Sequence, residues 1–266
     1  MINRIRHICA SHLSVSPDTL YVSKFYHGDG ERARKTIFLI TDGTQPLYIF
    51  KIARSAERNL LIEREYAALK DASARPHAPF NIPHPIGHGE LYGLAYSIER
   101  VVTGSVVSQQ QAPDLISYVV EFERQKQRGG TVTVGALSAV LEKIYIDGPA
   151  EYHVLQKELA AYATHSLVHA HAHGDLTFRN IIASPDSTYT LIDWEYAPYK
   201  PLWGIDFAHY ILRTYGPKGN VAHMFPEIQD SLPPLCIIDR IYDILQKHSR
   251  CDDIERLRDF LNAASA

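Results

Sequence analysis

The chain has 266 residues, of which 45% are hydrophobic, and it carries three cysteines and a formal net charge of -3 at pH 7. This length and apolar content suit one large domain or two lobes with a sizeable core. The charge lacks the basic excess of a nucleic-acid-binding protein, and no run of about eighteen apolar residues is present to span a membrane. Widely spaced cysteines and an N-terminus without an apolar signal core predict a reduced, cytoplasmic setting.

The first hundred residues predict a small sheet with one packed helix. Ile2, Ile5 and Cys9 recur at helical spacing and predict a short amphipathic helix that caps the fold. Residues 19–53 are rich in Tyr, Phe, Ile and Thr and are broken by HGDG and DGTQP, which predicts three antiparallel strands. Residues 56–72 have apolar residues at helical spacing and lack Gly and Pro, which predicts one helix of about four turns.

Beyond this helix the pattern changes twice. Residues 74–90, punctuated by Pro and Gly, predict a connection, and residues 91–102 predict a further strand. After Gly104 the sequence is mainly helical, with a hairpin expected where S-P-D-S separates two short apolar runs. Helices are expected at 115–126, 134–145 and 152–170, and a flexible loop at 124–133.

These elements predict an α+β protein with two lobes. The first, residues 1–100, would hold a small antiparallel sheet, and the second, residues 101–266, would be larger and mainly helical.

The most informative stretch is HGDLTFRN at positions 173–180, followed by a strand that ends at Asp193. Transfer of a phosphoryl group from ATP to a hydroxyl needs a carboxylate to accept the proton, oxygen ligands for Mg²⁺ and a cation on the phosphates. Asp175 would be the base, and Asn180 and Asp193 would ligate Mg²⁺, which prefers hard oxygens. The pattern H-x-D-x-x-x-x-N, a hairpin and a strand ending in Asp is typical of the protein-kinase-like fold.

HGDLTFRNII followed by LIDWEYAPYKPLWGIDFA resembles the aminoglycoside phosphotransferase and choline kinase branch of kinase-like enzymes. The resemblance is dense between residues 165 and 212. It implies an ATP- or GTP-dependent, Mg²⁺-dependent phosphotransferase, with the first lobe binding the nucleotide. It also implies that Asp206, in GIDFA, braces the catalytic loop.

The resemblance requires a strand lysine on the nucleotide phosphates and a helix glutamate that pairs with it. LYIFKIA offers Lys51, which apolar residues flank as they would a buried strand lysine. Glu65 lies four residues from both Leu61 and Leu69 and therefore on the inward face of the helix, whereas Glu63 does not. We therefore expect Lys51 to pair with Glu65.

Two further nucleotide contacts are expected from the first lobe. Gly28 and Gly30, between two strands, would let the backbone approach the phosphates closely. In SIERVVTG, which resembles the hinge that holds adenine, Ile98 and Arg100 would supply the backbone pair.

Departures from protein kinases indicate a small-molecule acceptor. Only twelve residues separate Asp193 from Asp206, and Trp194-Glu195 replaces the Phe-Gly that normally follows the metal-binding Asp. A long activation loop is therefore absent, which argues against a protein acceptor and against activation by phosphorylation. Aminoglycoside-like antibiotics, amino alcohols and sugars remain open as acceptors, and the sequence does not indicate an oligomeric state.

Further charged side chains are candidates for the site. Arg179, four residues after Asp175, would reach Asp175 or the transferring phosphate, although pairing with another acidic residue explains it equally well. A cationic acceptor could be bound by acidic side chains, which otherwise face solvent: Asp114, Glu121, Glu123, Glu142 and Glu195.

Two alternatives compete with this interpretation. His165, His169, His171 and His173 suggest a zinc site if they lie on a helix, but no further Cys or His completes four ligands. A kinase-shaped binding or regulatory module without catalytic activity is the other alternative, and the joint presence of Lys51, Glu65, Asp175, Asn180 and Asp193 argues against it.

Overall fold

The computed structural model describes residues 1–27, 35–74, 79–197, 199–216, 222–248 and 250–263. The chain forms two compact units. Unit 1 contains Met1–His77, Asn81–Ser105 and Ile182–Glu195, and unit 2 contains Ala78–Phe80, Val106–Ile181 and Tyr196–Ala266. The division into functional lobes at residues 1–100 and 101–266 stays a prediction.

Unit 1 is built on a five-stranded sheet in the order β1-β2-β3-β6-β5, with antiparallel neighbours throughout. This arrangement confirms the three predicted strands and the helix that follows them. The elements are α1 (Ile2–Leu13), β1 (Tyr21–His27), β2 (Lys35–Thr41), β3 (Pro46–Ala53), α2 (Asn59–Ser73), β5 (Pro85–Leu91) and β6 (Leu94–Arg100), with single 3-10 turns at Pro17–Thr19 and Ala56–Arg58.

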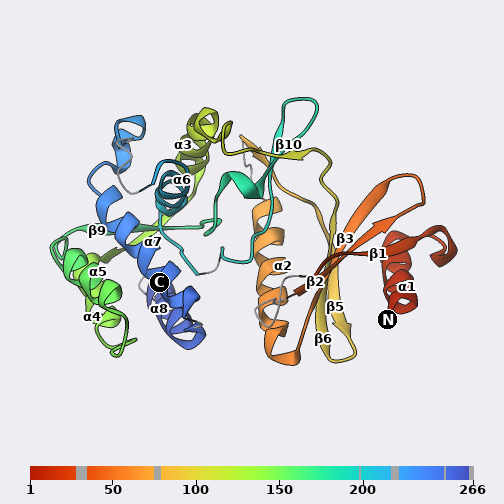
Figure 1. The fold of residues 1–266 in the computed structure, drawn as a ribbon, viewed down its shortest axis with the longest axis horizontal. Helices are drawn as coiled ribbons and strands as arrows, with labels where there is room; N and C mark the ends of the chain where they lie inside the picture. The colour runs from red at the N-terminus through yellow and green to blue at the C-terminus, as the bar shows by residue number, and fades with distance from the viewer. Residues whose placement is uncertain (28–34, 75–78, 198, 217–221, 249, 264–266) are drawn as a thin grey trace. The chain divides into compact units, whose positions relative to one another are not determined.

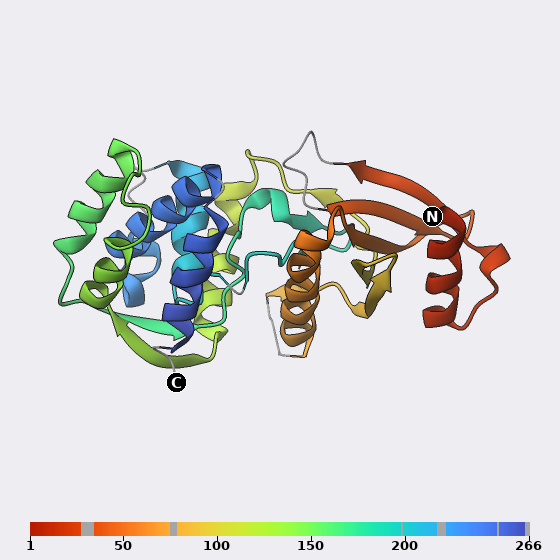
Figure 2. The same cartoon turned by 90° about the horizontal axis from the view of Figure 1, so that it is seen from below.

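The helices α1 and α2 lie on opposite faces of this sheet (Figures 1 and 2). Side chains alternate between the faces of a strand, so β3 contributes to both layers. Phe50 and Ile52 pack into the apolar cluster that includes Ile5 and Cys9 of α1. Burying a side chain such as Phe50 contributes about 1.5–3 kcal/mol, so the predicted N-terminal helix covers a substantial core. The other face of β3 is left for Lys51 and α2.

The segment predicted as a connection at residues 74–90 is partly a strand, which corrects the prediction. Residues 85–91 form β5, which pairs with β6 through a tight hairpin at Tyr92 and Gly93, both with positive φ. Two consecutive positive φ values match the right-handed twist of flanking strands. The many Pro and Gly residues hid this strand because β5 lies at the sheet edge, where they are tolerated.

Unit 2 is mainly helical, and α7 contacts α5, α6 and α8. In Figure 1 the helices α4 and α5 are green and α7 and α8 are blue. The helices are α3 (Ile116–Gln125), α4 (Val134–Leu141), α5 (Ala150–Ala160), α6 (Ile205–Tyr215), α7 (Leu232–Lys247) and α8 (Cys251–Ala263), with short 3-10 turns at Ala112–Leu115, Phe178–Asn180, Ala222–Met224 and Pro226–Ile228.

Two predictions for unit 2 were wrong. The expected loop at 124–133 contains β8 (Arg128–Thr133), and the expected helix at 152–170 ends at Ala160 and is followed by β9 (Ser166–Ala170). The two strands pair antiparallel, and the β-branched residues from Thr131 onward supply the regular part of the pairing. Because His169 lies in β9, the helical spacing behind the zinc alternative is absent.

Short strands form another sheet, in the order β4-β11-β10-β7. Its members are β4 (Phe80–Asn81), β7 (Ser105–Val106), β10 (Ile181–Ala183) and β11 (Tyr189–Leu191). The predicted hairpin is confirmed: the Ser184 N–H donates to the Thr188 carbonyl at 2.9 Å, and Ser187 adopts a φ of 64° in the turn. The hairpin leads directly to Asp193.

Among the helices that the structure describes, none combines the length and the apolar character needed to cross a membrane.

Candidate active site

In unit 1, Lys51 and Glu65 form a buried ion pair. Nζ of Lys51 lies 2.5 Å from Oε1 of Glu65 and 3.0 Å from Oε2 of Glu99. On α2 the buried positions are Ile62, Glu65, Leu69 and Ala72, while Glu63 is exposed. The buried face of α2 therefore includes Glu65, as the helical spacing of the apolar residues predicts, and Glu65 faces the sheet.

Lys35, at the start of β2, joins the same cluster and was missed from the sequence. Its Nζ lies 2.8 Å from Oε2 of Glu65, 2.8 Å from Oδ1 of Asp193 and 3.1 Å from Oε2 of Glu195. Ile37 of β2 pairs with Lys51 of β3, and Lys35 lies two residues before Ile37, so both lysines project from one face. Two lysines and four carboxylates, those of Glu65, Glu99, Asp193 and Glu195, therefore share this region of unit 1.

The charges in this cluster stabilise one another. Burial alone would raise the pKa of Glu65, but Lys35 and Lys51 lower it overall. Burial alone would lower the pKa of Lys51, yet Glu65 and Glu99 raise it above its ordinary value. Burial raises the pKa of Glu99, and Lys51 offsets this only in part. The lysines therefore stay charged and Glu65 stays ionised at neutral pH.

The acidic side of the cluster suits a magnesium ion. Carboxylate oxygens of Glu65, Asp193 and Glu195 lie within 4.8 Å of one another. They are the hard ligands that Mg²⁺ prefers, and the ammonium of Lys35 shows that the cluster accepts a cation. Asp193 has a φ of 66°, a left-handed conformation that Asp tolerates better than most residues.

In unit 2, the HGDLTFRN segment forms a tight loop. Asn180 donates from Nδ2 to the carbonyl of Asp175 at 2.8 Å and to its Oδ2 at 3.0 Å. Gly174 has a φ of 83°, and a Cβ at this position would lie 2.4 Å from the carbonyl oxygen of Tyr196. Only glycine fits this position without strain, which explains the Gly of the H-G-D motif.

Asp206 holds the loop from α6. Its carboxylate accepts hydrogen bonds from the N–H groups of His173 and Gly174, both at 2.7 Å. Lys126 lies 2.6 Å from Oδ2 of Asp206. Burial would raise the pKa of Asp206, but Lys126 lowers it overall. This geometry matches the brace that the family resemblance implies.

Glu123 has a structural role. It is therefore no longer a candidate for binding a cationic acceptor. It is fully buried, and its oxygens accept hydrogen bonds from the N–H groups of Gly204, Asp206 and Phe207 at 2.9–3.2 Å. A carboxylate at the N-terminus of a helix satisfies its free N–H groups and interacts favourably with the dipole. Glu123 therefore fixes the start of α6.

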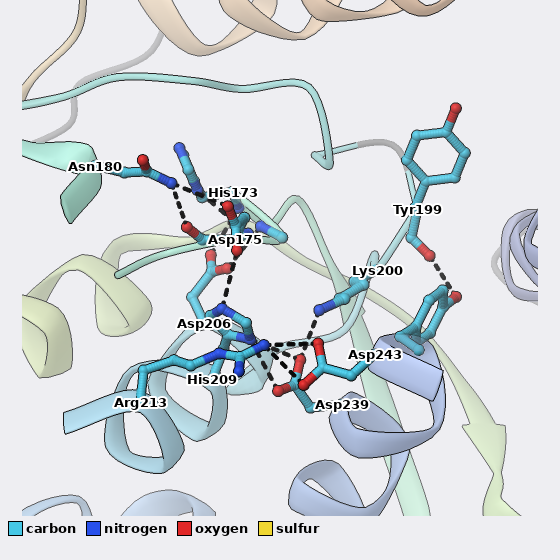
Figure 3. A network of polar contacts seen from close by, with 12 residues as sticks. His173, Asp175, Asn180, Tyr199, Lys200, Asp206, His209, Arg213, Asp239 and Asp243 are labelled. Carbon is cyan, nitrogen blue, oxygen red and sulfur yellow. Dashed lines mark hydrogen bonds and ion pairs between the residues drawn. The ribbon is translucent and has the colours of Figure 1, made fainter. Parts of the chain in front are cut away.

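Asp175 has a second partner that the sequence analysis missed. Nε2 of His209, on α6, lies 3.0 Å from Oδ1 of Asp175, and Nδ1 lies 2.8 Å from Oδ2 of Asp239 (Figure 3). Burial alone would raise the pKa of Asp175, but His209 lowers it overall. The carboxylate is thus ionised, and its side chain is 32% exposed.

Signals for some of the missed residues do exist in the sequence. His209 follows Asp206 by three residues, a spacing that places both on one face if the segment is helical, as it is in α6. Asp239 lies in an apolar stripe with Leu235 and Tyr242, where an isolated acidic residue needs a partner. Lys35 has no comparable signal, because its role depends on how the strands are paired.

The other predicted site residues remain predictions. Arg179 is exposed, and its guanidinium lies 5.7 Å from the ring centroid of Phe178. Ile98 is fully buried in β6, and the N–H of Arg100 donates to the His84 carbonyl at 2.9 Å. Gly28 and Gly30 lie outside the described residues.

Solved structures with the same fold cover nearly the whole chain. They include the GDP and kanamycin complex of the aminoglycoside phosphotransferase APH(2″)-IIIa, with 14% identity, 98% of each chain covered and a TM-score of 0.58. A thermostable mutant of aminoglycoside phosphotransferase APH(4)-Ia, in a ternary complex with ADP and hygromycin B, has 15% identity, 98% and 97% coverage and a TM-score of 0.59. At such identities the likeness shows the fold.

Sequence comparison identifies the family. No curated protein sequence matches the chain. The model of the phosphotransferase enzyme family matches residues 27–225, well over half of the sequence, and this range includes both the Lys51–Glu65 pair and the HGDLTFRN loop. The chain therefore belongs to the phosphotransferase enzyme family.

Proposed function

We propose that the protein transfers the γ-phosphoryl group of ATP or GTP to a hydroxyl of a small molecule. The observation that carries the proposal is the buried Lys51–Glu65 pair, at 2.5 Å, in a member of a phosphotransferase family. A lysine fixed in this way is a positioned cation for nucleotide phosphates. The GDP and ADP complexes of the two structural neighbours support a nucleotide substrate.

Different residues would bind the nucleotide and the acceptor hydroxyl. Lys51, fixed by Glu65, would bind the α and β phosphates, while Asp193 and Asn180 would hold Mg²⁺. The bound Mg²⁺ would neutralise charge that develops on the phosphates. Asp175 would orient the acceptor hydroxyl and accept its proton. The hydroxyl oxygen then bonds to the γ-phosphorus, the bond to the β-phosphate oxygen breaks, and the nucleoside diphosphate leaves.

Positioning should contribute most of the rate. Effective molarities of well-oriented groups correspond to about 7–11 kcal/mol, whereas general-base catalysis contributes about 10²–10⁴-fold. The exposed edge of Asp175 and its ionised state suit a group that binds and orients a hydroxyl.

A small-molecule acceptor is the best-supported class. The twelve residues between Asp193 and Asp206 leave no room for a long activation loop. Kanamycin and hygromycin B in the complexes of the neighbours make aminoglycosides the first acceptors to test, followed by amino alcohols and sugars.

The test is a coupled assay of nucleoside diphosphate release with ATP or GTP, Mg²⁺ and a panel of kanamycin, hygromycin B, choline and fructosamine. Acceptor-dependent release that Asp175→Asn reduces by about 10²-fold or more would support the proposal. Equal release by wild type and Asp175→Asn would contradict it.

One observation favours the alternative of an inactive nucleotide-binding or regulatory module. The ammonium of Lys35 lies on Asp193, where a catalytic metal would bind. If the Lys35 ammonium stays on Asp193 when a nucleotide binds, Mg²⁺ cannot bind Asp193 and phosphoryl transfer cannot use it. Metal-independent nucleotide binding without turnover on any acceptor would identify this alternative.

A further inference from the structure

A row of buried charges leads from Asp175 into the core of unit 2. His209 contacts Asp175 at 3.0 Å through Nε2 and Asp239 at 2.8 Å through Nδ1, and Lys200 lies 2.6 Å from Asp239. Figure 3 shows His209 on α6 between the carboxylates of Asp175 and Asp239. Asp239 is only 1% exposed, so it acts on a bound substrate through the groups that it contacts, of which His209 reaches Asp175 directly.

The chemistry of these partners determines where the protons lie. Burial alone would raise the pKa of Asp239, but Lys200 and His209 lower it well below its usual range. An ionised carboxylate only accepts hydrogen bonds, so Nδ1 of His209 carries a proton. Nε2 faces the carboxylate of Asp175. The ring attracts this carboxylate when Nε2 is protonated as well. A position between the carboxylates of Asp175 and Asp239 therefore favours an imidazolium.

The surroundings of His209 support this charge state. The facing groups are Asp175 in the catalytic loop, Lys200 before α6, Arg213 on α6, and Asp239 and Asp243 on α7. Three carboxylates thus face two cations. Burial alone would lower the pKa of His209, but Asp239 raises it overall, against the opposing charge of Lys200.

The contact leaves Asp175 able to bind a hydroxyl. A carboxylate offers about four acceptor positions. Asn180 uses one on Oδ2, His209 lies against Oδ1 as an ion-pair partner, and the side chain remains 32% exposed. The contact between Nε2 of His209 and Oδ1 is an ion pair and not a well-aligned hydrogen bond.

We propose that His209 is a positioning residue for phosphoryl transfer: its imidazolium, fixed by Asp239, holds Asp175 ionised and in one orientation toward the acceptor hydroxyl. This inference rests on the proposed function of Asp175 as the base. During transfer the hydroxyl proton passes to Asp175, the new oxygen–phosphorus bond forms as the bond to the leaving diphosphate breaks, and the proton then leaves to solvent from the exposed edge of Asp175.

The test compares His209→Gln and Asp239→Asn with wild type in steady-state MgATP hydrolysis, with water as the acceptor. Arg240→Gln is the matched control, because Arg240 is adjacent to Asp239 on α7 and its ion pair, with Glu151, is exposed. We expect kcat to fall about 10- to 100-fold in both test variants, with KM for MgATP as in wild type. Arg240→Gln should keep both values.

The pH profile separates positioning from a structural role. The imidazolium persists below the raised pKa of His209 and is lost above it, so wild-type kcat should fall on the alkaline side. His209→Gln should lose this fall. The proposal would be overturned if His209→Gln had the kcat of wild type and kept the alkaline fall. It would also be overturned if kcat, KM and unfolding free energy changed equally in His209→Gln, Asp239→Asn and Arg240→Gln.

A measurement on wild type alone covers the case in which the variants do not fold. Nitrogen-15 NMR of the His209 ring at pH 7 should show both nitrogens protonated, and a neutral ring would overturn the proposal. Wild type that neither binds nor hydrolyses MgATP would overturn the proposed function, and this inference with it. Turnover equal in wild type and His209→Gln would overturn only this inference.

Discussion

The ammonium of Lys35 lies 2.8 Å from Oδ1 of Asp193, the carboxylate that the sequence motif assigns to magnesium. The same ammonium contacts Glu65, so one lysine links the predicted metal ligand to the partner of Lys51. Burial would lower the pKa of Lys35, but Asp193, Glu195 and Glu65 raise it well above its ordinary value. A fixed cation therefore occupies the side of Asp193 that faces Glu65.

Lys35→Met should strengthen metal binding in the absence of nucleotide. A metal ion at Asp193 no longer has to displace or repel an ammonium, and the expected gain in Mn²⁺ affinity is about tenfold. Electron paramagnetic resonance of Mn²⁺ titrations measures it. Lys24→Met, an exposed position on β1, makes the same change in net charge and should have no effect. Equal Mn²⁺ affinity in wild type and Lys35→Met would show that Lys35 does not compete with the metal.

Glu65→Gln should disable the nucleotide site, whereas Glu63→Gln should not. Loss of the Glu65 charge leaves Lys51 with Glu99 alone and deprives Lys35 of one partner. We expect kcat/KM for MgATP to fall at least about tenfold and unfolding free energy to fall by about 3–5 kcal/mol. Steady-state kinetics and urea unfolding of both variants measure these effects. Similar kinetic losses in the two variants would contradict the assignment of Glu65.

Lys126→Met should destabilise the protein strongly because it leaves Glu123 and Asp206 buried without their cation. We expect a loss of about 3–5 kcal/mol in urea unfolding at pH 7. Arg124→Met, nearby on α3, breaks an exposed pair with Glu227 and should cost less than about 1 kcal/mol. Equal losses in the two variants would refute the role of Lys126.

The effect of Lys126 should also depend on pH. The folded pKa of Asp206 is lowered, so its stabilising contribution is present above the unfolded value of about 3.9 and is lost as pH falls through the folded value. In Lys126→Met the buried carboxyl groups can bind a proton instead. The difference in unfolding free energy between wild type and variant should therefore shrink from pH 7 to pH 4, and a difference that grows in acid would contradict this account.

Arg179→Ala tests the predicted catalytic role of that arginine. If Arg179 contacts the transferring phosphate, its loss should lower kcat/KM for the acceptor by about tenfold or more. Its exposed position over Phe178 is also consistent with a surface role, in which case kcat/KM stays unchanged. Steady-state kinetics with an identified acceptor decides between the two.

The parts of the fold with local signals could be predicted from the sequence. The strands of residues 19–53, α2 and the hairpin before Asp193 all follow from side-chain period and turn residues. The same reasoning placed Glu65 on the inward face of α2, because helical spacing alone decides between Glu65 and Glu63. It missed β5 and β8, where Pro and Gly resemble loop signals, although β5 pairs with the next strand β6 through a tight hairpin and β8 pairs with the distant strand β9.

Within the site, the residues that escaped prediction depend on long-range pairing. Lys35 reaches Asp193 across 158 positions of sequence, and Lys126 reaches Asp206 across 80. Glu123 illustrates the opposite error, because it was a candidate for binding a cationic acceptor and otherwise expected to face solvent, and instead it is buried and caps α6. A charge on a helix indicates a solvent-facing side chain unless a distant cation is brought against it, and a single sequence does not reveal such a partner.

The central claim is that the protein binds a nucleotide together with Mg²⁺ through Asp193. Calorimetric titration with ATP, with and without Mg²⁺, on wild type and Asp193→Ala tests it most directly. The account predicts binding by wild type that Mg²⁺ strengthens, and loss of this strengthening in Asp193→Ala. Absence of ATP binding by wild type in either condition, or equal Mg²⁺-dependent binding by Asp193→Ala, would contradict it.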